Sequence, residues 1–430
     1  MSIRTDWKGA VAVALSLAVL GLATCGGGGS NAPVTSGLTK RALVSDDIDG
    51  RLHIEDAQKD VESGFTIATG SQPGAMVLSP DKSITLVFNA GSRTLAVVSN
   101  SSESLLGSIA LPNVSTGYVS MSDNTVGFVA VPNCPPASCG GFSKVVGVVN
   151  LATTFNVTGV VNKALNPATM LYEPLQAATT LVLSPDGKKL LVFGGPGEHV
   201  DTLTFVDTAV AKTTPATAAT QIGPNPAFLN RPVSAVFSAD STKAYVLNCG
   251  PECAGPAASV TVLDMTASPP APVTNVPVPA ASVGLLSGNK LFVAGTPSGT
   301  PGSLAGRLSA LDTTALAPPA SSVPISDGFH NHMELASNNK LFVGAIICSA
   351  GCLTIFDTSK NSAVVDSNTG DVTGIAPISG RNVVYVVEDL VAGTFQGKGE
   401  LRIYDTTTDA LTPTQIDVVG KAVDVKYVDQ

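Results

Sequence analysis

Leu181-Val-Leu-Ser-Pro-Asp-Gly187 is followed by Lys189-Leu-Leu-Val-Phe193 and, after a Gly/Pro loop, by Thr202-Leu-Thr-Phe-Val-Asp-Thr208. The stretch contains three short runs rich in Val, Leu and Phe, separated first by a Ser-Pro-Asp-Gly turn and then by the loop. Apolar runs of this length between turn residues are typical of β-strands. The stretch therefore predicts a strand, a tight turn, a second strand, a loop and a third strand.

Looser copies of this unit fill nearly the whole chain. The third strand of each copy ends in an apolar residue followed by a polar, usually acidic one, and these pairs recur 44 to 57 residues apart: Ile54-Glu55, Val98-Ser99, Val149-Asn150, Val206-Asp207, Leu263-Asp264, Leu311-Asp312, Phe356-Asp357 and Tyr404-Asp405. A repeat of that length with about four strands is the sequence signature of a propeller blade. We therefore predict an all-β propeller of four-stranded antiparallel blades.

The two ends of the repeat region are incomplete blades that complement each other. Arg41 to Thr69 supplies a second, third and fourth strand without a first, whereas Ala422 to Val428 is a single orphan strand with clean alternation. An unpaired edge strand invites aggregation, so pairing the two ends would protect both. This closure predicts eight blades. Seven blades is the alternative, if the weak unit between Val126 and Leu151 merges with a neighbour.

The N-terminus has the pattern of an export signal. Arg4 and Lys8 precede an apolar run, Ala10 to Leu22, that is too short to span a bilayer. Leu22-Ala-Thr-Cys25 resembles the bacterial lipobox, although Thr precedes the cysteine where Gly, Ala or Ser is usual. The resemblance implies lipid attachment at Cys25 and an outer-membrane location, on the periplasmic or surface side. The alternative is an ordinary cleaved signal peptide, in which Cys25 has no role in lipid attachment.

The predicted organisation is therefore a lipoprotein signal peptide at 1–24, a flexible Gly-rich tether at 25–40 and a single propeller domain at 41–430. Such a protein would sit in the bacterial cell envelope and meet the membrane only through its lipid anchor. A monomer is expected. The net charge of −9 excludes nucleic acid as a partner, because nucleic-acid binding needs a basic face.

Ser184-Pro-Asp-Gly187, the apolar strand after it and the ending Val206-Asp-Thr208 resemble the YVTN-type (YncE-like) propeller repeat of bacterial envelope proteins. The resemblance covers roughly residues 41 to 430 as a periodic pattern. It implies the fold and the envelope location but no single activity, since the family hosts several functions. The only tryptophan is Trp7, so the tryptophan-based repeats of other propellers are absent.

Six cysteines remain after Cys25, and they form three close pairs that each follow a predicted second strand: Cys134/Cys139, Cys249/Cys253 and Cys348/Cys352. Pairs at one repeated position in an exported chain predict disulfides. A loop this short is stabilised by about 2 kcal/mol when it is closed by a disulfide. Metal binding is the rival interpretation, but it would need pairs from different blades to meet.

The long insertions predict which face binds. They all lie between a second and a third strand, at 132–144, 194–201, 249–259, 295–307 and 389–400. Loops at that position of successive blades open on one face of a propeller, and loops on a rigid scaffold are where binding sites are usually built. We therefore expect a binding or interaction scaffold that contacts a protein, a glycan or a small molecule with this face.

Candidate chemistry is sparse. His330, His332, His199 and Glu198 are expected to point towards the same face, where imidazoles with a carboxylate could hold a divalent metal. Ordinary polar loop residues are the competing interpretation. Convergence of these residues at the central funnel would favour a propeller hydrolase of the lactonase type over a scaffold without catalysis. No Gly-x-Ser-x-Gly motif is present, and no residue can be recognised as catalytic from the sequence.

Two further interpretations concern the start of the repeat region. His53 alternates with apolar neighbours and is expected on a strand surface. The segment from Ser45 to Asp56 partly resembles a calcium loop, but an Asp-Gly hairpin turn at Asp49-Gly50 explains it better.

Overall fold

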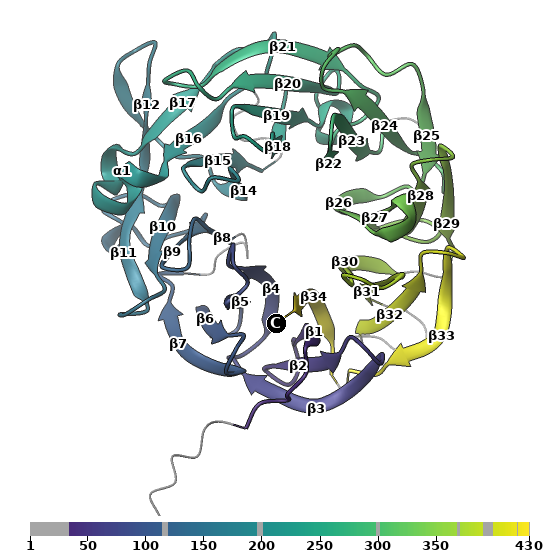
Figure 1. Cartoon of the computed structure of the whole chain (residues 1–430). Helices are drawn as coiled ribbons and strands as arrows, with labels where there is room; N and C mark the ends of the chain where they lie inside the picture. The colour runs from purple at the N-terminus through teal and green to yellow at the C-terminus, as the bar shows by residue number, and fades with distance from the viewer. Residues whose placement is uncertain are drawn as a thin grey trace, which may run out of the picture. The chain divides into compact units, whose positions relative to one another are not determined.

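The computed structural model describes residues 34–113, 119–195, 201–297, 302–367, 370–389, 399–418 and 420–429. The compact unit Thr35–Gln430 contains every described strand. These strands form eight antiparallel blades arranged in a ring (Figure 1), as the repeat predicts. Among the described residues, no helix is long and apolar enough to cross a membrane.

Each blade begins with its innermost strand. Blade 1 contains β34 (Ala422–Asp429), β1 (Lys40–Asp46), β2 (Arg51–Asp56) and β3 (Val61–Ala68); blade 2 contains β4 (Pro73–Leu78), β5 (Ile84–Asn89), β6 (Thr94–Ser99) and β7 (Ser104–Ala110). Blade 3 contains β8 (Val119–Met121), β9 (Val126–Val131), β10 (Val145–Asn150) and β11 (Asn156–Val161); blade 4 contains β14 (Ala178–Leu183), β15 (Lys189–Gly194), β16 (Leu203–Asp207) and β17 (Ala219–Ile222).

The second half of the ring repeats this order. Blade 5 contains β18 (Pro232–Phe237), β19 (Lys243–Asn248), β20 (Ser259–Asp264) and β21 (Ala271–Pro277); blade 6 contains β22 (Val283–Ser287), β23 (Lys290–Gly295), β24 (Gly306–Asp312) and β25 (Ser322–Ile325). Blade 7 contains β26 (Phe329–Leu335), β27 (Lys340–Ile346), β28 (Leu353–Asp357) and β29 (Ser362–Asp366); blade 8 contains β30 (Asp371–Pro377), β31 (Val383–Asp389), β32 (Gly399–Asp405) and β33 (Ala410–Ile416).

The ring closes as predicted, with the C-terminal strand inside the N-terminal blade. β34 pairs antiparallel with β1 over most of its length, from Lys40 opposite Asp429 to Asp46 opposite Ala422. The weak unit between Val126 and Leu151 does not merge with a neighbour, because β8 to β11 form a sheet of their own. The alternative of seven blades is therefore wrong.

Blade 4 departs from the repeat in two ways that the sequence analysis does not predict. A hairpin of β12 (Lys163–Asn166) and β13 (Leu171–Pro174) adds to the outer edge of β17. A short helix, α1 (Thr208–Thr213), also lies between β16 and β17. The Asp207 carboxylate caps the start of this helix by accepting from the amides of Ala209 and Val210. The repeated Asp thus begins a helix in this blade instead of a tight turn.

The acidic residues of the repeat are turn caps. In the turns between third and fourth strands, the carboxylates of Asp264, Asp312 and Asp405 accept from the amide two residues later at 2.8, 2.8 and 2.6 Å. Hydrogen bonds from the following threonines lower the pKa of all three. In Ser-Pro-Asp, the Ser184 hydroxyl donates to Asp186 at 2.6 Å and accepts from the Lys189 amide at 2.9 Å. These carboxylates are occupied in building turns.

The two kinds of tight turn, first-to-second and third-to-fourth strand, open on one side of the ring, here called the short-turn face. The insertions between second and third strands open on the other, the long-loop face. Apolar side chains from the second and third strands of adjacent blades form the cores between blades, such as Leu86 and Leu95 of blade 2 with Val129 and Val149 of blade 3. The blades are therefore held together mainly by apolar burial.

Candidate functional site

Three residues predicted to have special roles, Cys25, Glu198 and His199, lie outside the described residues. His330 and His332 lie on β26, the innermost strand of blade 7, and a β-bulge separates them: His330 is opposite Ala345, and His332 is opposite Gly344. A bulge re-aims the side chains on either side of it. The charged group near His330 is Asp327, whereas those near His332 are Asp424 and Lys426. The structure therefore gives the two imidazoles different surroundings.

His330 is enclosed by the protein. Its side chain has no solvent exposure, and neither ring nitrogen makes a well-formed hydrogen bond with the described residues, although the backbone of Ser326 lies close to the ring. Its Cε1 lies 2.9 Å from the position that a Cβ on Gly306 would occupy, so Gly306 leaves room for the ring. Burial lowers the pKa of His330 to about 4. These observations describe a neutral histidine packed between blades 6 and 7.

A different group has the spacing of metal ligands. Of the described His, Cys, Asp and Glu residues, Asp46, Asp49 and His53 offer ligand atoms within 4.8 Å of one another. His53 is only 5% exposed, so the expectation of a surface position is wrong. Its Nε2 lies 3.1 Å from Asp46 Oδ2.

The Asp46 carboxylate is already engaged by the backbone. Its Oδ1 accepts from the amides of Ile48 and Lys421, both at 2.9 Å. Burial acts to raise the pKa of Asp46, but these hydrogen bonds outweigh it and lower the pKa. The group thus ties the β1–β2 hairpin turn, where Gly50 has a φ of 69°, to the start of β34. Ring closure explains the cluster, and the predicted hairpin turn is present.

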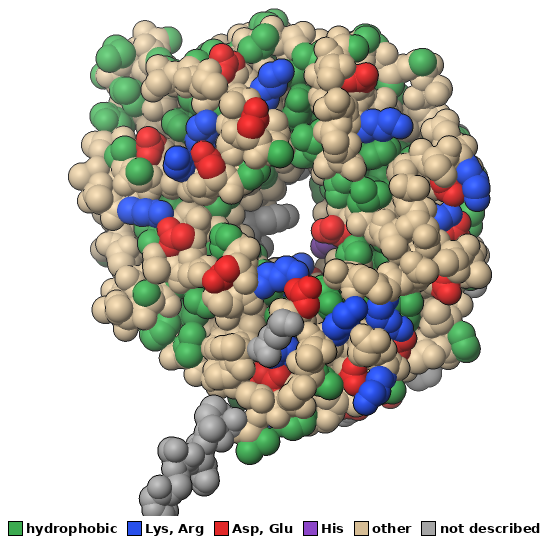
Figure 2. All heavy atoms as spheres, viewed as in Figure 1, with side chains coloured by type: hydrophobic (Ala, Val, Ile, Leu, Met, Phe, Trp, Pro, Cys, Tyr) green, Lys and Arg blue, Asp and Glu red, His purple; other side chains and the backbone are tan. Residues whose placement is uncertain are grey.

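The central channel has one charged side. Among the described innermost strands, ionisable side chains occur only on β26, β30 and β34, which belong to the adjacent blades 7, 8 and 1. The other five innermost strands, β4, β8, β14, β18 and β22, carry none. Figure 2 shows histidine and charged side chains at one side of the central opening. We call His332, Glu334, Asp424 and Lys426 the channel sector.

Asp424 anchors the channel sector to the backbone. Its Oδ2 accepts from the Met76 amide at 2.7 Å, and its Oδ1 accepts from the Val425 amide at 2.8 Å and from Lys426 Nζ at 3.0 Å. His332 Nδ1 is buried and has no partner among the described residues. The carboxylate is thus fixed, while the imidazole keeps an unused polar atom.

The remaining groups of the channel sector have shifted pKa values. Burial lowers the pKa of His332 to about 4, and Lys426 lowers it further against the opposing effect of Asp424. Desolvation by the surrounding channel wall also raises the pKa of Glu334, although its side chain is exposed, while Lys426 acts against that shift. A neutral imidazole can accept a proton, and a carboxyl with a raised pKa can donate one. His332 is predicted from the sequence as a site residue, whereas Glu334, Asp424 and Lys426 are not.

The long-loop face carries a cavity of about 490 Å³ between blades 5, 6 and 7, lined by Glu252, Thr296, Asp327, Phe329 and Ile347 among others. We call it the loop-face cavity. Phe329 is 39% exposed and Ile347 is 79% exposed, so apolar surface is open to a ligand there.

Glu252 is the most unusual group in the loop-face cavity. Its Oε2 accepts from the Ser282 hydroxyl and from the Thr296 amide, the latter at 3.1 Å. Its Oε1 is buried with no partner among the described residues. Burial raises the pKa of Glu252 even though these two hydrogen bonds lower it. The carboxyl therefore has one unsatisfied oxygen beside an open cavity.

Disulfides hold the walls of this cavity. The structure forms all three predicted bonds, Cys134–Cys139, Cys249–Cys253 and Cys348–Cys352. Glu252 lies inside the loop closed by the second bond, and Ile347 directly precedes the third. Two of the three disulfides thus fix side chains of the loop-face cavity.

A larger cavity, of about 1090 Å³, lies among the tight turns of the short-turn face, a face that the sequence does not predict to bind a ligand.

Comparison with known proteins shows the fold. No protein-family model matches the chain, and no curated protein is similar to it in sequence. Among solved structures, the dihydro-heme d1 dehydrogenase NirN in complex with DHE has a TM-score of 0.63 at 12% identity, over 90% of this chain and 74% of that one. The periplasmic gluconolactonase PpgL of Pseudomonas aeruginosa has a TM-score of 0.50 at 15% identity, over 90% of this chain and 99% of that one. At these identities, the likeness concerns architecture.

Proposed function

We propose that this protein is an envelope propeller that binds a ligand without catalysis, in the loop-face cavity. The observation that carries the proposal is the buried, unpartnered Oε1 of Glu252 beside exposed apolar surface between two disulfide-stapled loops. A buried carboxylate oxygen without a donor is costly, and a ligand that supplies a donor to Oε1 removes that cost.

The lining indicates the chemistry of the ligand. Glu252 and Asp327 are acidic, whereas Phe329 and Ile347 are apolar and exposed. A cationic amine or guanidinium next to an apolar group fits this combination, as in a peptide with an arginine beside an aromatic residue. The two disulfides make the walls of the cavity rigid. A rigid, preorganised site loses less conformational entropy when a ligand binds.

Calorimetric titration of the mature protein with the dipeptide amide Phe-Arg tests the proposal, with the Phe-citrulline analogue as the uncharged comparison. We expect the charged peptide to bind more tightly, and Glu252→Gln to weaken its binding at least about tenfold through loss of a charge-assisted hydrogen bond. Asp240→Asn, on the short-turn face, is the matched control. Equal binding of both peptides, or no effect of Glu252→Gln, would overturn the proposal.

The location is part of the same proposal. The apolar run from Ala10 to Leu22 supports export, the lipobox-like Leu22-Ala-Thr-Cys25 supports lipid attachment, and the YVTN-type pattern supports an envelope protein. Cells that express the protein should incorporate labelled fatty acid into it and retain it in the membrane fraction. Cys25→Ala should abolish both. Labelling that persists in this variant would contradict anchoring at Cys25.

A second candidate function is hydrolysis of a lactone in the channel sector. It is favoured by the neutral His332 beside Glu334, whose pKa is raised, and by Lys426, which could stabilise a developing oxyanion. Gluconolactone hydrolysis above the spontaneous rate, lost in both His332→Ala and Glu334→Gln, would support it. A rate equal to the spontaneous one would exclude gluconolactone as substrate and leave the binding proposal in place.

A further inference from the structure

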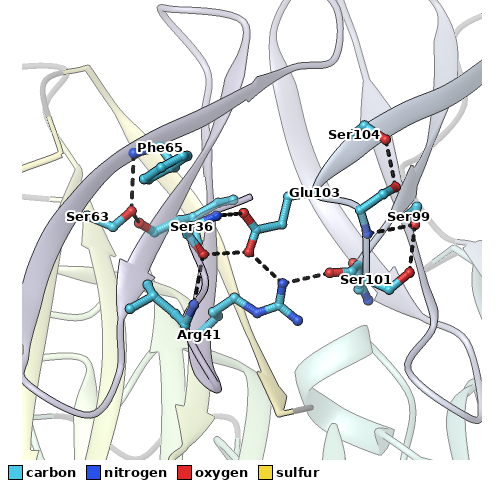
Figure 3. Close-up of polar contacts among 12 residues, drawn as sticks. Ser36, Arg41, Ser63, Phe65, Ser99, Ser101, Glu103 and Ser104 are labelled. Atoms are coloured by element: carbon cyan, nitrogen blue, oxygen red, sulfur yellow. Dashed lines mark hydrogen bonds and ion pairs between the residues drawn. The ribbon is translucent and has the colours of Figure 1, made fainter. Parts of the chain in front are cut away.

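Ion pairs join adjacent blades at three consecutive junctions, and we call each of these pairs a clasp. At each one, a carboxylate in the turn between the third and fourth strands reaches a cation of the preceding blade. The pairs are Lys340 with Asp409 at 2.6 Å, Arg381 with Asp60, and Arg41 with Glu103 at 2.7 Å (Figure 3). Asp60 also accepts from the Tyr385 hydroxyl at 2.6 Å. The clasped junctions join blades 7, 8, 1 and 2, on both sides of the ring closure.

Leu316 of blade 6 takes the place of the clasp carboxylate. The amides of Asp60 and Asp409 donate at 2.9 Å to the carbonyls of Asp56 and Asp405, each four residues earlier, and their φ angles are 59° and 56°. The Leu316 amide donates in the same way to Asp312, also at 2.9 Å, with a φ of 50°. The three turns therefore share one backbone geometry, and among these three only blade 6 has an apolar side chain at this point.

Blade 5 still carries residues that correspond to the cation and the tyrosine of the other clasps. Lys243 is opposite Asp264 in its sheet, as Lys340 is opposite Asp357. Tyr245 follows two residues later on β19, as Tyr385 follows Val383 on β31. Neither the Lys243 ammonium nor the Tyr245 hydroxyl has a hydrogen-bond or ion-pair partner in the described part of the chain. Lys243 is exposed, whereas the ring of Tyr245 is buried.

The space left by the missing acid is open. The cavity of about 1090 Å³ lies at this junction, and its lining includes Lys243, Tyr245 and Leu316 with the apolar side chains of Val236 and Leu286. The Tyr245 hydroxyl is not itself buried, so a ligand in this cavity can reach it. Here the donors of a clasp face a cavity whose lining combines these apolar side chains with polar ones, among them Asn289 and Asp240, whose carboxylate caps its own turn.

We propose that this cavity binds an organic carboxylate with an apolar body. The ligand carboxylate accepts from Lys243 and Tyr245, as Asp409 accepts from Lys340 and Asp60 accepts from Tyr385. Its apolar body packs against Val236, Leu286 and Leu316. The site lies on the short-turn face and is independent of the function proposed for the loop-face cavity.

Fluorescence titration with 1-pyrenebutyrate, and with its uncharged methyl ester, tests the proposal. We expect the carboxylate to bind one per chain and the ester at least about tenfold more weakly. Lys243→Gln combined with Tyr245→Phe should reduce carboxylate binding by a similar factor. Lys360→Gln, which removes one lysine charge from the same face in blade 7, should leave it unchanged.

Leu316→Asp is the sharpest variant, because it installs the carboxylate that the other junctions have. It should raise the melting temperature and abolish binding of pyrenebutyrate, since its own carboxylate occupies Lys243 and Tyr245. Equal affinity for acid and ester, or unchanged binding in the Lys243/Tyr245 double variant, would overturn the proposal, and so would unchanged binding in a folded Leu316→Asp protein.

Discussion

Arg41 of blade 1 donates to Glu103 of blade 2 at 2.7 Å, and the two side chains are only 2% and 3% exposed. Arg41 also donates to the carbonyl of Asn100 at 2.6 Å. The amide and hydroxyl of Ser36 donate to the same Glu103 carboxylate, as Figure 3 shows. This one carboxylate thus joins two blades and fixes the segment that leads into the ring.

Glu103→Gln should destabilise the protein by about 3 kcal/mol at neutral pH, because it leaves the Arg41 charge buried without its counter-ion. Burial acts to raise the pKa of Glu103, but Ser36 and Arg41 together lower it below its ordinary value of 4.5. The stabilisation is therefore complete above pH 4.5 and is lost as the pH falls through the lowered pKa. Urea unfolding of both proteins should show the difference shrinking below pH 4.5. The exposed Asp417→Asn is the control, and a pH-independent difference would contradict the prediction.

Glu55 should make stability fall as the pH rises. It is fully buried on β2, and neither carboxyl oxygen has a partner among the residues that the structure describes. Burial, with a smaller effect of Glu62, raises the pKa of Glu55 from 4.5 to about 8. The folded protein thus holds a proton that the unfolded chain releases between these values.

The expected loss approaches about 1.4 kcal/mol per pH unit over that window. Glu55→Gln cannot titrate, so its stability relative to the wild type should increase between pH 5 and pH 8 and level off above. Chemical denaturation across this range measures the effect. A constant difference between the two proteins would show that Glu55 does not carry the proton.

Removal of one disulfide should affect both stability and binding. Cys249→Ser with Cys253→Ser should cost about 2 kcal/mol and should also weaken Phe-Arg binding, because Glu252 lies within the released loop. Cys134→Ser with Cys139→Ser, in blade 3, is the matched control, with a similar stability loss and unchanged binding. Equal binding losses in the two double variants would point to a general loosening of the ring.

Ligand binding in the loop-face cavity should strengthen as the pH rises. Burial raises the pKa of Glu252, and a cationic ligand needs the ionised carboxylate. Affinity for Phe-Arg should therefore rise with pH until the raised pKa of Glu252 is passed, and binding should release protons below it. Titrations in buffers of different ionisation enthalpy measure this release. The same pH dependence in Glu252→Gln would assign it to another group.

The central channel shows why only part of the candidate site is predictable. His332 is conspicuous because the chain has only four histidines. Glu334 is an ordinary strand residue in sequence, and Asp424 and Lys426 lie in the strand that closes the ring. Their proximity to His332 depends on β34 standing inside blade 1, two blades along from β26. The bulge after His330 has no signal in the sequence, yet it decides where each imidazole points.

The amino-acid sequence by itself determined the propeller, its eight blades, its closure and its three disulfides. These features follow from local rules: strands alternate with turn residues, the repeat counts the blades, and cysteines four or five residues apart can meet within one hairpin. The tertiary structure alone decided the channel sector, the loop-face cavity and the clasps between blades. Pairs such as Arg41 and Glu103 meet because neighbouring sheets pack at a particular rotation and register, which are set by side-chain packing across the whole ring and not by the period of the repeat.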